Sequence, residues 1–408
     1  MKQVKKNKIL YLFTINFPYG NGESFLYNEL QLLSEKFNSI LLFPLDSLDK
    51  KISYNLPSNV SLNHFNMFES YSRPKVLMEN LSLVLYIYAF EIINSKNKLK
   101  YIFKFKSTLF NLLNKIAAAD RFYSINANKL NKNTVLYTYW FNQWTFILSV
   151  INVKYQKINL HTRIHGMDVF EEQHKSLNFF FQFRAFQFRQ LKKVYSISQA
   201  GKNHLLQQNK ISTNKIEVSR LGVNSIGLSS INNSNIINIV SCANCMPYKR
   251  IHLIIESLRK IVLPLKWVHF GDGELINELK LQATSLPKNI EVIWMGHKSN
   301  QEILQYYTTN TIDVFISTSE TEGIPVSMME AISAGIPIIA TNVGGVKEIV
   351  TNDIGILLPK NFDTIDLALS ITDEKWKLLD KKLIFQYWKT NFSAESNYNQ
   401  LAHFLNQS

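Results

Sequence analysis

Two glutamates in the second half of the chain have the types and spacing needed to hold a phosphorylated ligand by its hydroxyl groups. Glu322 and Glu330 stand eight positions apart in SETEGIPVSMMEAISAGIP (319–337). Pro325 suits the first turn of a helix and Gly335 suits the left-handed position just past its end, so we expect a helix between them. The free amides at such a helix start attract phosphate, whereas carboxylates accept hydrogen bonds from vicinal hydroxyls. The pattern indicates one ligand with a phosphate, a sugar ring near it and a ribose further away.

Regular strands and helices must position these glutamates. In the second half, apolar β-branched runs recur at 235–243, 265–270, 289–295, 311–317, 335–341 and 354–358, with segments of helical length between them. Strands that alternate with helices at this spacing predict βαβ crossovers and a parallel sheet. Glu322 then lies in the loop after the 311–317 strand, at the sheet edge where α/β proteins bind ligands.

The first half has the same organisation in a looser form. Strands are expected at 8–15, 39–44, 133–139, 157–164, 192–198 and 215–221, a helix at 23–36, and long helices from 74 to 130. The Ser- and Asn-rich segment 224–236 is expected to be a linker. A chain of 408 residues favours two domains over one. We therefore predict an α/β protein with two Rossmann-like domains, 1–225 and 226–380, facing across a cleft, with 381–408 packing back on the first.

Charge is concentrated in the first half. Residues 1–225 carry 30 Lys and Arg against 13 Asp and Glu, a net charge of +17, whereas residues 226–408 carry 15 against 18, a net charge of −3. Cations interleave with aromatics at 96–106 and 179–193. Such segments suit an anionic membrane surface; single-stranded nucleic acid and a plain solvated helix face are the alternatives.

Targeting and redox features are few. The apolar stretch 81–93 is too short to span a bilayer and predicts a buried or interfacial helix. The basic N-terminus leads into the first strand without a signal-peptide cleavage site, so the chain is expected to be cytoplasmic, with possible peripheral attachment to the inner face of the membrane. Cys242 and Cys245 form a lone C-x-x-C, which cannot supply four zinc ligands and is expected to be structural.

The stretch 319–350 resembles the Glu-x7-Glu donor motif of family 4 retaining glycosyltransferases, which have the GT-B fold. The resemblance is strongest from 236 to 360. It implies that Glu322 holds hydroxyls of the transferred sugar and that Glu330 holds the nucleotide ribose. The backbone at Gly323, Ile324, Pro325 and Val326 would meet the sugar and phosphate, and Gly323 leaves room for that approach.

A second donor element resembles the family's Gly-Arg-Leu…Lys segment and lies in SCANCMPYKRIHLIIESL (241–258). Lys249 matches the lysine, which would neutralise the departing diphosphate. Asn244 stands where the family has arginine, and Arg250 is the candidate replacement. Gly271 and Gly273, with Gly296 and His297, are expected to shape the nucleobase pocket.

Two elements of the first half complete the resemblance. TRIHGMDVF (162–170) is similar to the family's His-Gly-x-Asp loop, which implies that His165 reaches the sugar or the β-phosphate and that Asp168 braces the loop. His161 lies four residues before His165 without a HExxH pattern, so a zinc site is not expected. Gly20, Gly22 and Glu23 match the family's glycine loop near the acceptor and the donor phosphates. Weaker candidates, Arg220 and Gly222, follow the strand at 215–221.

The resemblance predicts transfer of a sugar from a nucleotide-sugar, with UDP as the expected nucleotide, to a saccharide or lipid-linked saccharide in surface polysaccharide synthesis. Retention of anomeric configuration is implied by the resemblance alone. No Asp-x-Asp pair occurs, which fits a metal-independent enzyme without a cofactor. Nucleic acid is not an expected partner. The alternatives are a nucleotide-sugar epimerase of related fold and a non-catalytic module that binds membrane or RNA.

Overall fold

The protein divides into two compact units. The computed structural model describes residues 8–20, 22–45, 51–67, 69–171, 179–208 and 213–407. The N-terminal unit comprises Met1–Ser219 with Tyr398–Ser408, and the C-terminal unit comprises Arg220–Asn397. The whole segment expected to be a linker, 224–236, therefore lies in the C-terminal unit. Ser225 Oγ donates a 2.6 Å hydrogen bond to the carbonyl of Ser333, which ties this segment down.

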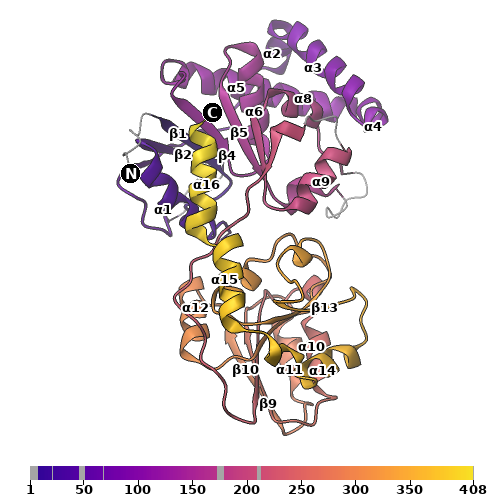
Figure 1. Ribbon diagram of the computed structural model, residues 1–408. Coiled ribbons are helices and arrows are strands. Elements are labelled where there is room, and N and C mark those ends of the chain that lie inside the picture. The colour runs from indigo at the N-terminus through magenta and orange to yellow at the C-terminus, as the bar shows by residue number, and fades with distance from the viewer. Residues whose placement is uncertain are drawn as a thin grey trace. The chain divides into compact units, whose positions relative to one another are not determined.

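In the N-terminal unit, the described strands form a parallel sheet (Figure 1). Their order across the sheet is β3 (Val60–Leu62), β2 (Ser39–Pro44), β1 (Ile9–Thr14), β4 (Thr134–Thr138), β5 (Asn159–Ile164), β6 (Lys193–Ser196) and β7 (Ile216–Val218). Six of these strands agree with the predicted runs, and the three-residue β3 was not predicted. Because β2 and β4 lie on opposite sides of β1, the strand order reverses there, and ligands bind at such a point, beyond the carboxyl ends of the strands.

The helices of the N-terminal unit enclose the sheet and extend beyond it. They are α1 (Leu26–Lys36), α2 (Arg73–Glu79), α3 (Leu81–Asn94), α4 (Lys98–Phe103), α5 (Phe105–Asn126), α6 (Gln143–Lys154), α7 (Gly166–Val169), α8 (Arg184–Gln190) and α9 (Gln199–Gln208). A fully buried ion pair, Arg163 Nη1 to Glu29 Oε2 at 2.7 Å, joins β5 to α1. Tyr137 donates to the other oxygen of Glu29 at 3.0 Å. These bonds satisfy charges that would be costly if left unpaired in the core.

The aromatic segment 179–193 is mostly interior, contrary to its expected place on a membrane or nucleic-acid surface. Its side chains Phe180, Phe183, Phe186 and Phe188 all belong to the main hydrophobic core of the N-terminal unit. Alternating aromatics and cations fit a buried helix as well as a surface, and here the aromatics pack against α3 and α6.

The C-terminal unit contains a second parallel sheet, in the order β10 (Ile290–Gly296), β9 (Leu265–Phe270), β8 (Ile237–Cys242), β11 (Val314–Ser317), β12 (Ile338–Thr341) and β13 (Gly355–Leu358). Its helices are α10 (Ile251–Leu258), α11 (Ile276–Ala283), α12 (Asn300–Thr309), α13 (Val326–Ser333), α14 (Thr364–Thr372) and α15 (Lys381–Asn391). Five of these strands fall within the predicted runs, and β10 extends one residue past its run, to Gly296. The strand order reverses at β8, between β9 and β11.

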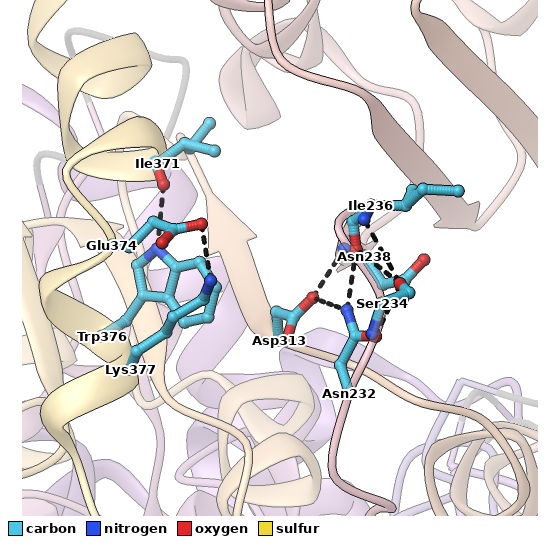
Figure 2. Close-up of polar contacts among 9 residues, drawn as sticks. All are labelled: Asn232, Ser234, Ile236, Asn238, Asp313, Ile371, Glu374, Trp376 and Lys377. Carbon is cyan, nitrogen blue, oxygen red and sulfur yellow. Dashed lines mark hydrogen bonds and ion pairs between the residues drawn. The ribbon is translucent and has the colours of Figure 1, made fainter.

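Asp313 lies at the amino ends of β8 and β11 and forms hydrogen bonds there (Figure 2). One of its carboxylate oxygens accepts hydrogen bonds from the backbone amide of Asn238 at 2.8 Å and from the side chain of Asn232 at 2.6 Å. Figure 2 also shows Trp376, whose indole N–H donates to the carbonyl of Ile371 at 3.0 Å after α14. The Asp313 hydrogen bonds tie β8 to the start of β11 at their amino ends and leave the carboxyl ends to the loops that follow.

The C-terminal segment differs from the prediction that residues 381–408 pack on the first domain. Helix α15 belongs to the C-terminal unit, where Trp388 and Phe392 are buried, and only residues from Tyr398 onward group with the N-terminal unit. The boundary falls within α16 (Ala394–Asn406). The start of α15 packs against the end of α13, which accounts for its place.

Candidate functional site

The helix between the two glutamates is α13, and it follows the strand-end loop of β11. It begins at Val326, with Pro325 as the residue before the first turn, one position later than expected. Gly335 ends it with a φ of +71°, as predicted, and a Cβ there would lie 2.7 Å from the carbonyl oxygen of Lys381. The first amides of α13, at Val326 and Ser327, have no partner within the helix. The loop before them is therefore suited to an anion.

Lys249 and Glu322 contact each other directly. The Lys249 Nζ lies 2.6 Å from Glu322 Oε1, and the two side chains are only 18% and 12% exposed. Lys249 comes from the loop after β8 and Glu322 from the loop after β11, so the bond joins the two strand ends at the point where the strand order reverses. The structure thus brings together two residues 73 positions apart that were both predicted to bind the donor.

Arg250 forms hydrogen bonds with the backbone of the Glu322 loop, whereas it was expected to bind the donor in place of an arginine. It has a left-handed backbone with φ of +49°, and its Nε donates to the carbonyl of Thr318 at 2.8 Å. Its Nη2 donates to the carbonyl of Ser319 at 3.3 Å, and Thr318 Oγ1 donates back to the Arg250 carbonyl at 2.9 Å. These bonds hold the Glu322 loop against the Lys249 loop. They lend no support to the expectation that Arg250 replaces the missing arginine at the exposed Asn244.

Two glycines that sequence reasoning did not single out define the shape of the Glu322 loop. Gly344 has a φ of +52°, and a Cβ on it would lie 1.8 Å from the carbonyl oxygen of Glu322. Gly345 donates from its amide to the carbonyl of Gly323 at 2.8 Å, and a Cβ there would lie 2.3 Å from that oxygen. The Gly-Gly pair in the loop after an apolar strand was the available signal, because paired glycines permit close backbone approach.

Glu330 is buried on α13 with a single side-chain partner among the described residues. The side-chain amide of Asn300, the first residue of α12, donates to Glu330 Oε1. Burial raises the pKa of Glu330 to about 7, and the Asn300 hydrogen bond opposes that rise. A carboxylate in this setting gains strongly from hydroxyl donors, because it has left water without full compensation. Asn300 is a second residue that sequence reasoning missed.

Replacing Glu330 with glutamine should stabilise the protein at alkaline pH. The folded-state pKa of about 7 lies above the ordinary 4.5, so this group's favourable contribution is present below pH 4.5 and is lost as pH rises through 7. Glutamine avoids the cost of the buried charge, about 3 kcal/mol above pH 7. Denaturant unfolding at pH 4.5 and pH 8 measures the gain. A Glu330→Gln advantage that does not grow with pH would contradict this account, and the half-exposed Glu320→Gln is the control.

The remaining donor candidates lie in loops that pack on one another. A Cβ on Gly271 would lie 1.9 Å from the carbonyl oxygen of Ala243, and one on Gly273 would lie 3.0 Å from the backbone of Cys245. These two glycines allow the loop after β9 to close on the loop after β8. Gly296, with a φ of +66°, accepts from the amide of Gly271 at 2.9 Å. His297, which follows it, is exposed.

His165 and Asp168 lie at the carboxyl end of β5 in the N-terminal unit. The Asp168 carboxylate accepts a 3.0 Å hydrogen bond from the His165 amide. The Asp168 amide donates a 3.0 Å hydrogen bond to the His165 carbonyl, so Asp168 braces the loop. The His165 Nε2 lies 3.1 Å from the carbonyl of Tyr139 and must donate to it. Burial, followed by the nearby Arg163, lowers the pKa of His165 to about 3. The ring is therefore neutral near pH 7.

Glu23 has an internal role instead of the expected place beside an acceptor. It is 3% exposed, and its carboxylate accepts from the amides of Ile15 at 3.2 Å and Phe17 at 2.6 Å. It also accepts from the indole N–H of Trp140, whose ring lies 4.1 Å from the His165 ring, centroid to centroid. Glu23 thus shapes the loop after β1 and supports Trp140 against His165.

The remaining candidates are the two glycines near Glu23 and the pair Arg220 and Gly222. A Cβ on Gly20 or Gly22 would meet nothing within 4 Å, although Gly20 has a φ of +62°. Arg220 forms a 3.5 Å ion pair with Glu348. A Cβ on Gly222 would lie 2.4 Å from the Cα of Ala394, which makes Gly222 a packing residue.

The two cysteines are free thiols in the C-terminal unit. Cys245 is buried with its Sγ 3.5 Å from Nε2 of His269, and burial raises the pKa of both thiols. Within the described ranges, no group of three or more His, Cys, Asp or Glu side chains is arranged to hold a metal ion.

Known proteins resemble both the sequence of the C-terminal unit and the whole fold. Residues 230–375 match the family described as glycosyl transferases group 1. The chain is 33% identical over 114 residues to the UDP-Gal:alpha-D-GlcNAc-diphosphoundecaprenol alpha-1,3-galactosyltransferase of Escherichia coli. That alignment covers 27% of this chain and only 28% of the relative's own length.

Solved structures extend the likeness to the full chain. Sucrose-phosphate synthase of Thermosynechococcus elongatus has a TM-score of 0.68 at 15% identity, and the alignment covers 98% of each chain. Alr3699/HepE of Anabaena in complex with UDP and glucose has a TM-score of 0.61 at 15% identity, covering 98% of this chain and 100% of that one. The chain therefore has the GT-B fold, which confirms the predicted fold class. Residues 230–375 thus match a glycosyltransferase family in sequence, and the comparisons do not favour the epimerase or the non-catalytic module.

Proposed function

We propose that the protein is a retaining glycosyltransferase that moves a sugar from a nucleotide-sugar to a saccharide or lipid-linked saccharide acceptor. The observation that carries the proposal is the 2.6 Å contact between Lys249 and Glu322 in the loop before α13, with Glu330 buried on the same helix. Lys249 and the start of α13 would bind a diphosphate. The two carboxylates, at different depths, would bind a sugar and a ribose. UDP is the proposed nucleotide, and the UDP and glucose bound by the Anabaena structure support that choice.

In the proposed reaction, the bond between the sugar C1 and the diphosphate oxygen breaks, and the diphosphate leaves with the electron pair. Lys249 and the first amides of α13 stabilise the charge that develops on that leaving group. An acceptor hydroxyl attacks C1 from the same face, and its proton passes to a phosphate oxygen of the leaving group. Glu322 holds sugar hydroxyls, and Glu330 holds the ribose hydroxyls.

A panel of nucleotide-sugars tests this function. We expect one donor to be hydrolysed slowly alone and faster with a saccharide acceptor, with release of a nucleoside diphosphate. Lys249 and the helix start are proposed to carry the leaving-group charge, so removing divalent ions with EDTA should change the rate by less than about twofold. A loss of about 1.4 kcal/mol of transition-state stabilisation would instead lower the rate about tenfold. NMR of the product should show the donor's anomeric configuration. Release of free epimerised nucleotide-sugar, or an inverted product, would contradict the proposal.

A further inference from the structure

Helices α2 to α5 expose a set of large apolar side chains that the fold leaves uncovered. We name this set the α3–α4 surface; its members are Met78, Leu81, Leu85, Tyr86, Ile92, Ile93, Leu99, Ile102, Phe103, Phe105 and Phe110. Phe103 is 84% exposed and Met78 is 74% exposed. Figure 1 shows α2, α3 and α4 along the outer edge of the N-terminal unit. Soluble monomers rarely expose apolar side chains in such continuous groups, which mark binding surfaces.

Helix α3 is apolar on both of its faces. Its inner face buries Val84, Ile87 and Tyr88 in the core of the N-terminal unit. The opposite face presents Leu85 and Ile93, which are 61% and 66% exposed. An amphipathic surface helix would carry charged residues there, whereas a helix that is apolar all round is normally covered. The sequence of α3 therefore fits an apolar environment on its outer side.

The charge around this surface is positive. Residues 73–106 contain seven Lys and Arg and two Glu. One of those glutamates, Glu91, is buried and accepts hydrogen bonds from Tyr101 and Phe186. Lys98 and Lys106 are exposed beside the apolar side chains. Cations at the rim of an apolar surface match the anionic headgroups that border the acyl region of a membrane.

Among the described residues, no single helix is long and apolar enough to cross a membrane. Helices α2 and α3 pass the length and composition test only as a pair, and the chain bends by 81° between them. We propose that the α3–α4 surface docks on an anionic lipid membrane, with apolar side chains in the acyl boundary and lysines at the phosphates. This inference goes beyond the transfer reaction and is tested without any donor.

Flotation with vesicles tests the inference on the full chain. Vesicles of phosphatidylcholine with about 30% phosphatidylglycerol should carry the protein at low salt, and binding should weaken in pure phosphatidylcholine. Because each basic residue near the surface contributes about a fivefold affinity factor, Lys98→Gln with Lys106→Gln should weaken binding by more than about tenfold. Ile102→Ser with Phe103→Ser should weaken it by at least about tenfold in high salt as well, since screening leaves apolar insertion intact.

Matched controls are available in the C-terminal unit. Leu378 is 86% exposed, close to the value for Phe103, and Leu378→Ser should leave vesicle binding unchanged. The exposed pair Lys288 and Lys389, changed to glutamine, controls for net charge. Equal effects of test and control variants would overturn the inference. So would absence of binding to the anionic vesicles, binding to single-stranded RNA that depends on the same residues, or a dimer in solution that Phe103→Ser dissociates.

Discussion

Replacing Glu322 with alanine should lower kcat/KM for the donor by about 10- to 150-fold. The basis is the loss of a charged hydrogen bond to the sugar, worth about 1.5–3 kcal/mol. The carboxylate is largely shielded from solvent beside Lys249, so its interaction with a bound hydroxyl is weakened little by water. Steady-state kinetics with the donor found in the nucleotide-sugar panel measure the effect.

The neighbouring Glu320 provides the control for this substitution. It lies two residues earlier in the same loop, but it pairs at 3.3 Å with Lys360, and both side chains are about half exposed. Glu320→Ala should change kcat/KM by less than about twofold, as expected for an exposed ion pair. Unchanged kinetics in Glu322→Ala with a verified donor would remove Glu322 from the site.

Replacing Gly344 with alanine should impair both folding and activity. The substitution places a Cβ at a φ of +52°, 1.8 Å from the Glu322 carbonyl oxygen, so the backbone must move. Left-handed strain and displacement of a packed loop together cost about 2–4 kcal/mol. Because the displaced residue is Glu322, the rate should fall by about 10²-fold in the protein that remains folded. Denaturant unfolding and kinetics on the same sample measure both effects.

The substitution Gly323→Ala distinguishes an effect on loop stability from an effect on ligand binding. A Cβ on Gly323 meets no atom within 4 Å in the free protein, so Gly323→Ala should leave the free energy of unfolding within about 0.5 kcal/mol. If the donor approaches this backbone, the added methyl group should raise KM. Gly344→Ala with wild-type stability and rate would show that the Gly344 contact does not position Glu322.

Much of the fold could be predicted because its signals are local. Continuous apolar runs marked β8 to β13, and Pro325 and Gly335 marked the limits of α13 within one residue. The three-residue β3 escaped because so short a run has no distinctive pattern. The burial of 179–193 escaped because the same alternation of aromatics and cations fits a core helix and a surface.

The place of a candidate residue in the fold could be predicted where one segment carries both the residue and its signal. Glu322 lies in the loop after β11, Lys249 lies in the turn before α10 and Glu330 lies within α13, and the structure places all three in the C-terminal unit. Asn300 reaches Glu330 across 30 residues of sequence, and Gly344 meets Glu322 only through the register of β12 beside β11. Such contacts depend on tertiary packing. The inward direction of the Glu23 carboxylate also depends on tertiary packing, so the sequence did not indicate it.

Calorimetric titration of the full chain with UDP, GDP and ADP tests the central claim most directly. That claim is that Lys249, Glu322 and Glu330 form the binding site for a nucleotide-sugar. We predict saturable binding of one diphosphate, at least about tenfold weaker in Glu330→Ala and in Lys249→Ala, and unchanged in Glu320→Ala. Failure of all three nucleotides to bind, or binding that both site variants leave intact, would contradict it.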